Sequence, residues 1–225
     1  MIAKLDPTPN PFLLIRATIE TELPAPGVLT VSSALPRDGK TGVASGIVRS
    51  LAAAGYTALA IDAGASTPHA ISVDAASSML AESARPMDAG CDFIAIAPAQ
   101  ARAASAASVA AFFAAIRSRY DYAVVDAAVI NAGGLAFARG ADGVVLALRE
   151  GRAVSEADRE AVELFERLRV RFLGVIATRD ESSGDLPVAQ SLYERLQPRI
   201  AGRRVTPVAA DEPARGAAPA YRSAV

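Results

Sequence analysis

The stretch VSSALPRDGKTG, residues 31–42, decides the fold class of this chain. It follows an expected strand, Val28–Ser32, and opens an expected helix, Lys40–Ala54. A loop in this setting lets backbone N–H groups and the helix N-terminus surround a phosphate group. The Lys40 ammonium would neutralise β- and γ-phosphates, and the Thr41 hydroxyl would hold Mg²⁺. The sequence therefore predicts a phosphate-binding loop made of Pro36, Arg37, Asp38, Gly39, Lys40, Thr41 and Gly42.

The match to the usual pattern GxxxxGK[ST] is partial, because Ala34 stands where the first Gly is expected. Lysine usage supports the assignment: Lys4 and Lys40 are the only lysines, and the other basic residues are arginines. A compact ammonium suits a narrow phosphate pocket in which Arg would not substitute. The alternative is a surface turn at Asp38-Gly39 that caps a helix. The position between a strand and a helix favours phosphate binding.

Outward from this loop, short apolar segments alternate with helical ones. Near-continuous apolar strands joined by crossover helices are typical of a parallel sheet that is buried on both faces. We therefore predict an α/β fold of three layers, with a mostly parallel sheet flanked by helices on both faces. The further expected strands are Thr57–Asp62, Phe93–Ala97, Tyr122–Asp126, Gly143–Leu148 and Arg171–Thr178, and the further helices are Pro11–Glu22, Ala104–Arg119, Ser155–Arg169 and Pro187–Gln197.

Two acids end neighbouring segments of this pattern. Asp62 follows TALAI, and Asp126 follows the apolar run YAVV. Ligands of open α/β sheets gather at the carboxyl ends of the strands. An Asp placed like Asp126, at the end of an apolar strand, often binds Mg²⁺ or its water shell. Each Asp alone is common as a helix cap or turn former, but with the loop they form a set. We assign catalytic roles to Lys40, Asp62 and Asp126, and metal ligation to Thr41, Asp62 and Asp126.

The composition excludes several classes of protein. The 225 residues are 52% hydrophobic with a net charge of −1, so no basic excess points to nucleic acid. One Cys and one His exclude a disulfide scaffold and a Cys/His metal cluster. The N-terminal stretch MIAKLDPTPN lacks the apolar core of a signal peptide, and the apolar runs are far shorter than the roughly 20 residues that span a bilayer. We expect a soluble, cytoplasmic protein.

The domain organisation is simple. The expected helix Pro11–Glu22 places residues 1–27 as an N-terminal helical extension, which Pro and Gly residues separate from the next strand. Residues 28–208 form the predicted nucleotide-binding domain. Residues 209–225 are rich in Ala, Pro, Gly and Arg without periodicity, so we predict a flexible tail.

Residues 27–64 resemble the nucleotide-binding segment of the bacterial tyrosine kinases (BY-kinases) of capsule and exopolysaccharide assembly, relatives of the ParA/MinD P-loop ATPases. The similarity continues through RSRYDYAVVDAAVI, residues 117–130, and through residues 140–178, so it covers roughly residues 10–180. The resemblance implies a P-loop NTPase fold of the ParA/MinD type. The family pattern S-x-x-P-x-x-G-K-[ST] is matched by Ser33, Pro36, Gly39, Lys40 and Thr41.

The sequence departs from the family at two motifs around the γ-phosphate. In hhhDxDxR, Asp62 matches the first Asp, while Gly64 and Ser66 replace the second Asp and the Arg. In hhhDTPP, Asp126 matches, while alanines at 127–128 replace Thr-Pro. Phosphoryl transfer depends on positioning and charge stabilisation, so these losses should lower the rate severely. We predict kinase activity that is weak or lost.

Other family features are also reduced. Of the N-terminal E-x-x-R-x-x-R element that drives ring assembly, Arg16 alone remains, with Asn10 and Leu13 at the other positions. The family's adenine-binding Asn would fall near Thr178, and its tyrosine cluster is reduced to Tyr221.

Charged residues after the strand that ends at Leu148 have two interpretations. Arg149 and Arg152 lie where the family approaches the nucleotide, but ordinary solvation is at least as expected. The acidic residues of 156–166, with interleaved arginines, are typical of a solvated helix face paired at i,i+4.

The resemblance implies ATP (or ADP) and Mg²⁺ as cofactors and a membrane polysaccharide copolymerase as partner. The protein would be cytoplasmic, or peripheral at the inner membrane through that partner, and a homo-oligomer is left open. The first hypothesis is an ATP-binding, kinase-like protein of exopolysaccharide polymerisation and export. The second is a non-catalytic adaptor with the same fold. A ParA/MinD-like positioning ATPase ranks third, because its second loop lysine is absent among Ala34, Leu35 and Arg37.

Overall fold

The computed structural model describes residues 10–63, 70–87, 90–130, 133–178 and 206–208. Within these residues, the chain forms an eight-stranded sheet of order β3-β4-β2-β5-β1-β6-β7-β8. All strand pairs are parallel except β3 with β4. The strands are β1 Gly27–Ser32, β2 Ala58–Asp62, β3 Arg85–Pro86, β4 Asp92–Ala95, β5 Tyr122–Asp126, β6 Gly143–Arg149, β7 Phe172–Thr178 and β8 Thr206–Val208.

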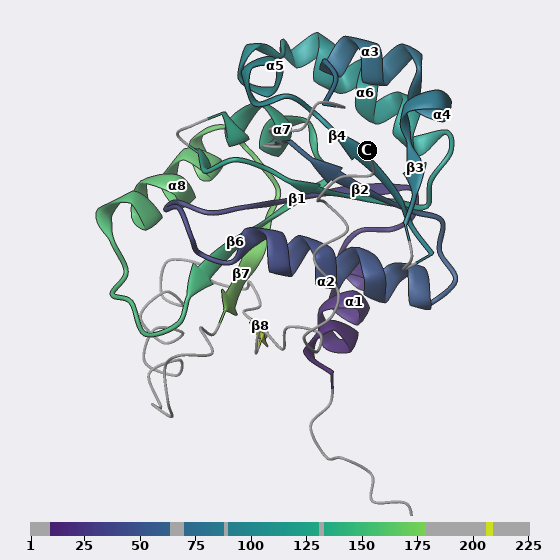
Figure 1. The fold of residues 1–225 in the computed structure, drawn as a ribbon. Coiled ribbons are helices and arrows are strands. Elements are labelled where there is room, and N and C mark those ends of the chain that lie inside the picture. The colour runs from purple at the N-terminus through teal and green to yellow at the C-terminus, as the bar shows by residue number, and fades with distance from the viewer. Residues whose placement is uncertain (1–9, 64–69, 88–89, 131–132, 179–205, 209–225) are drawn as a thin grey trace, which may run out of the picture.

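Helices cover both faces of the sheet, as Figure 1 shows. On one face α1 and α2 lie side by side, and the other face carries the remaining helices. The predicted three-layer α/β architecture with a mostly parallel sheet is confirmed. The helices are α1 Pro11–Glu22, α2 Lys40–Ala53, α3 Val73–Ser78, α4 Leu80–Ser83, α5 Pro98–Ala103, α6 Ala106–Arg117, α7 Gly134–Gly140 and α8 Glu156–Arg167.

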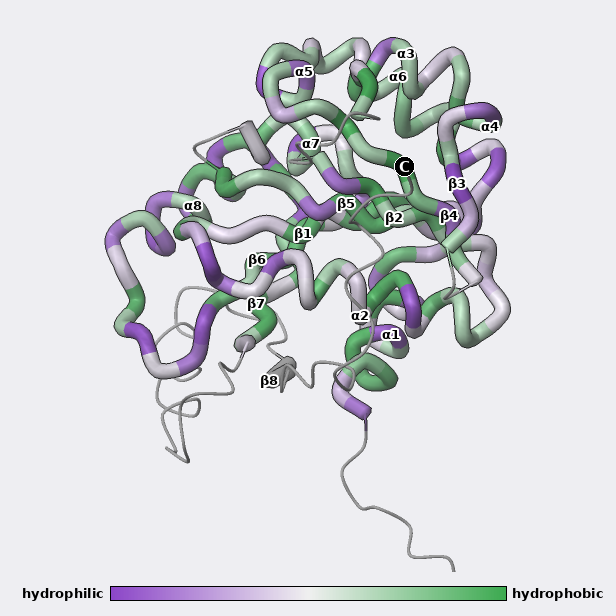
Figure 2. Tube along the Cα trace, in the orientation of Figure 1, coloured by the Kyte–Doolittle hydropathy of each residue, from purple (hydrophilic) through white to green (hydrophobic). Residues whose placement is uncertain are grey.

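Alternation along the central strand explains why two helical layers form. In β1, Leu29 and Val31 pack with the buried side of α2, while Val28 points to the opposite face and packs with α6. Every residue of β1 is buried, as expected for a central strand covered twice. Figure 2 shows hydrophobic residues concentrated in this central part of the sheet. The apolar runs noted in the sequence therefore form the core.

The N-terminal helix α1 has the predicted bounds and packs on α2. The Asn10 side chain caps it by accepting a hydrogen bond from the Phe12 N–H, and Pro11 occupies its first turn. Ile15 and Ile19, four positions apart on one face of the helix, are buried. The Phe12 ring lies against Gly46 of α2, where a Cβ atom would be 2.0 Å from the ring. The extension is thus joined to the domain by close contact.

The structure contains short elements that the sequence did not reveal. The helices α3, α4, α5 and α7 have 6, 4, 6 and 7 residues, too few for a helical period to stand out in alanine-rich sequence. Elsewhere the predicted boundaries shift by one or two residues. The expected helix Pro187–Gln197 and the tail lie outside the described residues. No described helix is long and apolar enough to cross a bilayer.

The buried residues include the chain's one thiol. Cys91 precedes β4 and packs in the core on the α2 side, with 3% of its surface exposed. Burial raises the pKa of this thiol above its ordinary value. It is therefore a small core residue, away from the acids at the ends of the strands.

Candidate functional site

The carboxyl ends of the central strands meet at one edge of the sheet. β1 lies between β5 and β6 and runs parallel to both, and β2 runs parallel to β5. The register places Asp126 beside Val31 of β1 and beside Asp62 of β2. The loop after β1 therefore emerges next to both predicted acids.

The loop ends in a geometry suited to an anion. Gly39 is the N-cap of α2 with φ 79°, and Arg37 also has a positive φ of 64°. No side chain in the described residues caps α2, and its first turn contains no acidic residue. Its first N–H groups therefore remain available at the positive end of the helix dipole. Backbone N–H groups of such a turn form the concave nests that bind phosphate.

Glycine is required at position 39 for two reasons. Its φ lies in the left-handed region that side chains disfavour, and a Cβ atom there would lie 2.9 Å from the Thr178 side chain. The Thr178 hydroxyl donates to the Asp38 carbonyl at 3.0 Å. Thr178, near which the adenine-binding Asn of the BY-kinases would fall, is 5% exposed and contacts the loop through this hydrogen bond.

Thr41 and Asp126 are brought into direct contact. The Thr41 hydroxyl donates a hydrogen bond of 2.6 Å to Asp126 Oδ2 across a sequence separation of 85 residues. Burial raises the pKa of Asp126 to about 6, and the neighbouring Asp62 also raises it. The Thr41 hydrogen bond and the Lys40 charge act in the opposite direction. Lys40, Thr41, Asp62 and Asp126 thus influence one electrostatic site.

The donor set fits Mg²⁺ that arrives with phosphate. Mg²⁺ is usually held by one or two carboxylates together with substrate phosphates and water, rather than by a cage of protein ligands. Thr41 and Asp126 supply oxygens at the helix N-terminus, with Asp62 beside them. In the described part of the chain, no group of three or more His, Cys, Asp or Glu side chains could hold a metal alone. The residues therefore fit Mg²⁺ bound as a nucleotide complex.

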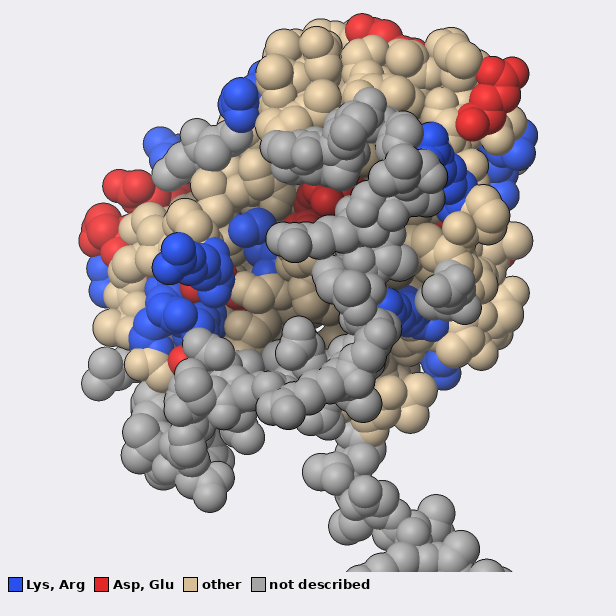
Figure 3. All heavy atoms as spheres, in the orientation of Figure 1, with Lys and Arg blue, Asp and Glu red and all other residues tan. Residues whose placement is uncertain are grey.

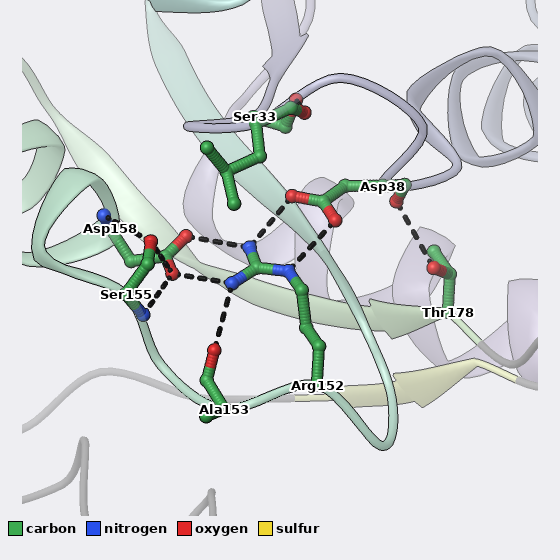
Figure 4. Close-up of polar contacts among 8 residues, drawn as sticks. Ser33, Asp38, Arg152, Ala153, Ser155, Asp158 and Thr178 are labelled. Atoms are coloured by element: carbon green, nitrogen blue, oxygen red, sulfur yellow. Dashed lines mark hydrogen bonds and ion pairs between the residues drawn. The ribbon is translucent and has the colours of Figure 1, made fainter.

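Asp38 differs from the other loop residues in where its side chain points. Its side chain is 2% exposed, and its carboxylate accepts hydrogen bonds from Arg152, at 2.9 Å from Nε and 2.7 Å from Nη2 (Figure 4). This side chain is engaged within the protein. A role of Asp38 in phosphate binding would come from its backbone.

Sequence reasoning missed the partners of Asp38. From the sequence, solvation of Arg152 is at least as expected as a functional role, yet the structure also pairs it with Asp158 at 2.6 Å. Asp158 belongs to a stretch interpreted as a solvated helix face, but it is 8% exposed. It forms the capping box of α8 with Ser155. The pattern S-x-x-D at residues 155–158 was the signal that could have identified this buried acid.

Some of the positions that depart from the kinase pattern lie within the described residues, and others do not. Ala127 is 1% exposed and joins the core. Gly64 and Ser66 lie outside the described residues. At the N-terminus, Asn10 caps α1, and Arg16 pairs with Glu20 at 3.3 Å. These two N-terminal residues therefore make contacts within the chain.

Solved structures with the same arrangement place this fold among known ones. The kinase domain of the Escherichia coli tyrosine kinase ETK is 19% identical, with 77% of this chain and 74% of that chain covered and a TM-score of 0.62. Cobyrinic acid a,c-diamide synthase from Mycobacterium smegmatis, with bound ADP and magnesium, is 15% identical, with 77% and 81% covered and a TM-score of 0.65. McdA from Cyanothece, in complex with ATP, is 17% identical, with 81% and 82% covered and a TM-score of 0.62.

The fold is that of the ParA/MinD-type P-loop NTPases. Bacterial tyrosine kinase domains share it, which confirms the predicted fold. No family model and no curated protein matches the sequence. At these identities the likeness shows the fold alone.

Proposed function

We propose that this chain binds ATP or ADP with Mg²⁺ at the loop 36–42 and acts as a kinase-like protein of weak or lost kinase activity. The contact between Thr41 and Asp126 carries the proposal, because it joins the hydroxyl and the carboxylate suited to Mg²⁺ at an uncapped helix N-terminus. Cobyrinic acid a,c-diamide synthase with bound ADP and magnesium, and the complex of McdA with ATP, support this choice of ligand.

Each residue of the site has a defined task. Backbone N–H groups of Gly39 to Gly42 would orient the phosphates, and the Lys40 ammonium would neutralise their charge. Thr41 and Asp126 would hold Mg²⁺, with Asp62 beside them. A bound Mg²⁺–nucleotide would supply a phosphoryl group activated for transfer. Figure 3 shows acidic atoms near the centre of the visible face with basic groups on both sides.

Weak or lost transfer follows from the missing charges. Gly64 and Ser66 supply neither the second carboxylate nor the Arg of the kinase pattern, and Ala127 replaces a threonine. The stabilisation of a transferring phosphoryl group depends on such charges, and removing one donor commonly lowers a rate about 100- to 1000-fold.

The biological setting is also a proposal. We place the protein in the cytoplasm, or at the inner membrane through a membrane polysaccharide copolymerase, where it acts in or regulates exopolysaccharide or capsule polymerisation and export. The resemblance of residues 27–64, 117–130 and 140–178 to the BY-kinases of capsule and exopolysaccharide assembly supports this placement. The alternative is a non-catalytic adaptor of the same partner, which the loss of charged groups at positions 64 and 66 favours.

Calorimetric titration with ATP and Mg²⁺ tests nucleotide binding. We expect micromolar affinity in the unaltered protein. We expect this affinity to be lost in Lys40→Ala, because Lys40 provides the only lysine ammonium group in the loop. Lys4→Ala is the matched control, since it removes the chain's other lysine, which does not belong to the loop 36–42. Absence of binding in the unaltered protein would reject the nucleotide-binding proposal and favour the adaptor.

A separate assay tests the weak kinase activity. Purified protein incubated with Mg²⁺–ATP should show little phosphotyrosine, beside a Lys40→Ala blank. Strong autophosphorylation on tyrosine would overturn this part of the proposal and leave nucleotide binding intact.

A further inference from the structure

Arg152 binds two carboxylates from separate parts of the chain. It follows β6, and its side chain lies between the phosphate loop and the start of α8 (Figure 4). Its Nε and Nη2 donate to Asp38 at 2.9 and 2.7 Å, and its Nη1 and Nη2 donate to Asp158 at 2.6 and 2.7 Å. Its Nη1 also donates to the Ala153 carbonyl at 3.1 Å. All five N–H groups of the guanidinium are thereby used.

The α8 side of this cluster is anchored independently. Asp158 accepts hydrogen bonds from the Ser155 N–H at 2.8 Å and from the Ser155 hydroxyl at 2.7 Å. Burial acts to raise the pKa of Asp158, but hydrogen bonds from Arg152 and Ser155 hold it below its ordinary value. Asp158 therefore stays charged and fixes the guanidinium at the helix start.

The loop side of the cluster lies where the backbone is least favourable. Asp38 stands between Arg37 and Gly39, which both have positive φ. A left-handed conformation is costly for a residue with a Cβ atom, and it persists when surrounding contacts enforce it. The Asp38 carboxylate is held by Arg152 and its carbonyl by Thr178. Both ends of this residue are thus fixed by groups that follow β6 or end β7.

We infer that Arg152 is a positioning residue, which holds the phosphate loop in its binding shape before any ligand arrives. This inference rests on the proposed function of the loop. Through Asp38 the guanidinium sets the course of residues 37–39, and hence the direction of the N–H groups that meet a phosphate. Arg is needed because its planar fork bonds two carboxylates at once, whereas the ammonium of Lys cannot form both bidentate pairs.

Three variants separate this role from simple support of α8. Arg152→Lys keeps the charge but loses the fork, and Asp38→Asn removes the loop-side charge while leaving the pair between Arg152 and Asp158. Asp158→Asn alters the helix side. The control is Arg159→Lys, on the same helix in an exposed pair with Glu156. Asp38→Asn conserves volume, so it tests the inference even where Arg152→Lys is unstable.

The first measurement is hydrogen exchange of the Val43 backbone amide, which donates to the Gly39 carbonyl of the loop at 3.1 Å, in the protein without ligand. Arg152→Lys and Asp38→Asn should each speed this exchange about tenfold, and the double variant should be no worse than either, since both act through one contact. Asp158→Asn should act mainly on the start of α8. Exchange at the unaltered rate in both Arg152→Lys and Asp38→Asn would overturn the inference.

The second measurement is affinity for Mg²⁺–ATP. Arg152→Lys and Asp38→Asn should each weaken binding about tenfold, and the double variant should lose no more affinity than either single variant. Arg159→Lys should leave the affinity unchanged. Lys40→Ala distinguishes the two proposals, because it should abolish binding while loop exchange stays at the unaltered rate. If the unaltered protein binds no nucleotide, the proposed function fails, and the exchange rates still support or overturn the role of Arg152. Additive losses of affinity in the double variant would contradict the inferred role of Arg152 in positioning the loop.

Discussion

Among the site residues, Asp126 shows how the fold changes one group's chemistry. At the end of a buried strand its carboxyl is desolvated, and the pKa rises from 3.8 to about 6. The Thr41 hydroxyl contacts the ionised group and partly offsets this rise. In the free protein the buried, ionised Asp126 therefore lowers the free energy of unfolding, although its carboxylate is suited to a divalent cation. Such perturbed pKa values are common at functional sites.

Replacement of Asp126 by Asn should reveal this cost. A raised folded pKa stabilises the protein at pH below the unfolded value of 3.8, and that stability is lost as pH rises through about 6. Asp126→Asn should therefore raise the free energy of unfolding by about 3 kcal/mol at pH 8 and change it little near pH 3.5. Denaturant unfolding at the two pH values measures it.

Asp121 provides a control of opposite sign. Hydrogen bonds from the Thr57 hydroxyl and N–H hold the pKa of Asp121 below its ordinary value. Its contribution is present above the unfolded value and is lost as pH falls through the lowered one. Asp121→Asn should thus be destabilised at pH 8 and converge with the unaltered protein at low pH. A destabilised Asp126→Asn at pH 8 would contradict the assigned environment.

At the scale of elements, the contact between α1 and α2 depends on a missing side chain. Gly46 lets the Phe12 ring approach α2, and the Ser50 hydroxyl donates to the Phe12 carbonyl at 3.1 Å. Arg16 adds a hydrogen bond to the Ser50 carbonyl at 3.1 Å. Together these contacts join the N-terminal helix to the helix that begins at the phosphate loop.

Gly46→Ala should break this packing. The new Cβ would lie 2.0 Å from the Phe12 ring, so the ring must leave and lose its buried contacts. We expect a loss of about 1–3 kcal/mol in the free energy of unfolding, measured in denaturant. Gly42→Ala is the matched stability control, because its Cβ would meet nothing within 4 Å.

Phe12→Ala tests the cause. In that background Gly46→Ala should stabilise the protein, because Ala is favoured over Gly inside a helix by about 1 kcal/mol. An equal loss with and without the Phe12 ring would exclude the steric explanation.

The elements also show what the sequence can predict. α1 and β5 have the predicted bounds, since Pro11 and an apolar run ending in Asp126 mark them locally. The environment of Arg152 could not be predicted in this way. Its partner Asp38 is 114 residues distant, and only the assembled sheet brings the two together. Local pattern thus predicts the loop and the strand ends, whereas the contacts that fix the loop are tertiary.

For the whole molecule, the sheet order collects residues from distant segments at one edge. β1 is central, with β5 and β6 as neighbours and β7 beyond β6. The loop after β1 consequently meets Asp126 from one side and Arg152 and Thr178 from the other. A ligand that binds this edge engages much of the folded domain, so its binding energy should add to global stability.

Thermal unfolding should therefore respond to nucleotide. At about 100 times the dissociation constant, a ligand of the native state adds about 2.7 kcal/mol. For a domain of this size we expect Tm to rise roughly 5–10 °C with Mg²⁺–ATP. Lys40→Ala should show no rise, and Lys4→Ala should match the unaltered protein. An equal rise in Lys40→Ala would place nucleotide binding away from the loop.

The buried Cys91 allows local opening of the protein to be measured by thiol labelling. It is the only cysteine among the 225 residues, so an alkylating reagent reports on one position. Thiolate reacts and buried thiol does not, and here burial also raises the pKa, so labelling must await an opening of the chain around β4. The labelling rate therefore measures the frequency with which the chain around β4 opens. Repeating it with Mg²⁺–ATP would show whether a ligand on the loop after β1 slows opening at β4, two strands beyond β5.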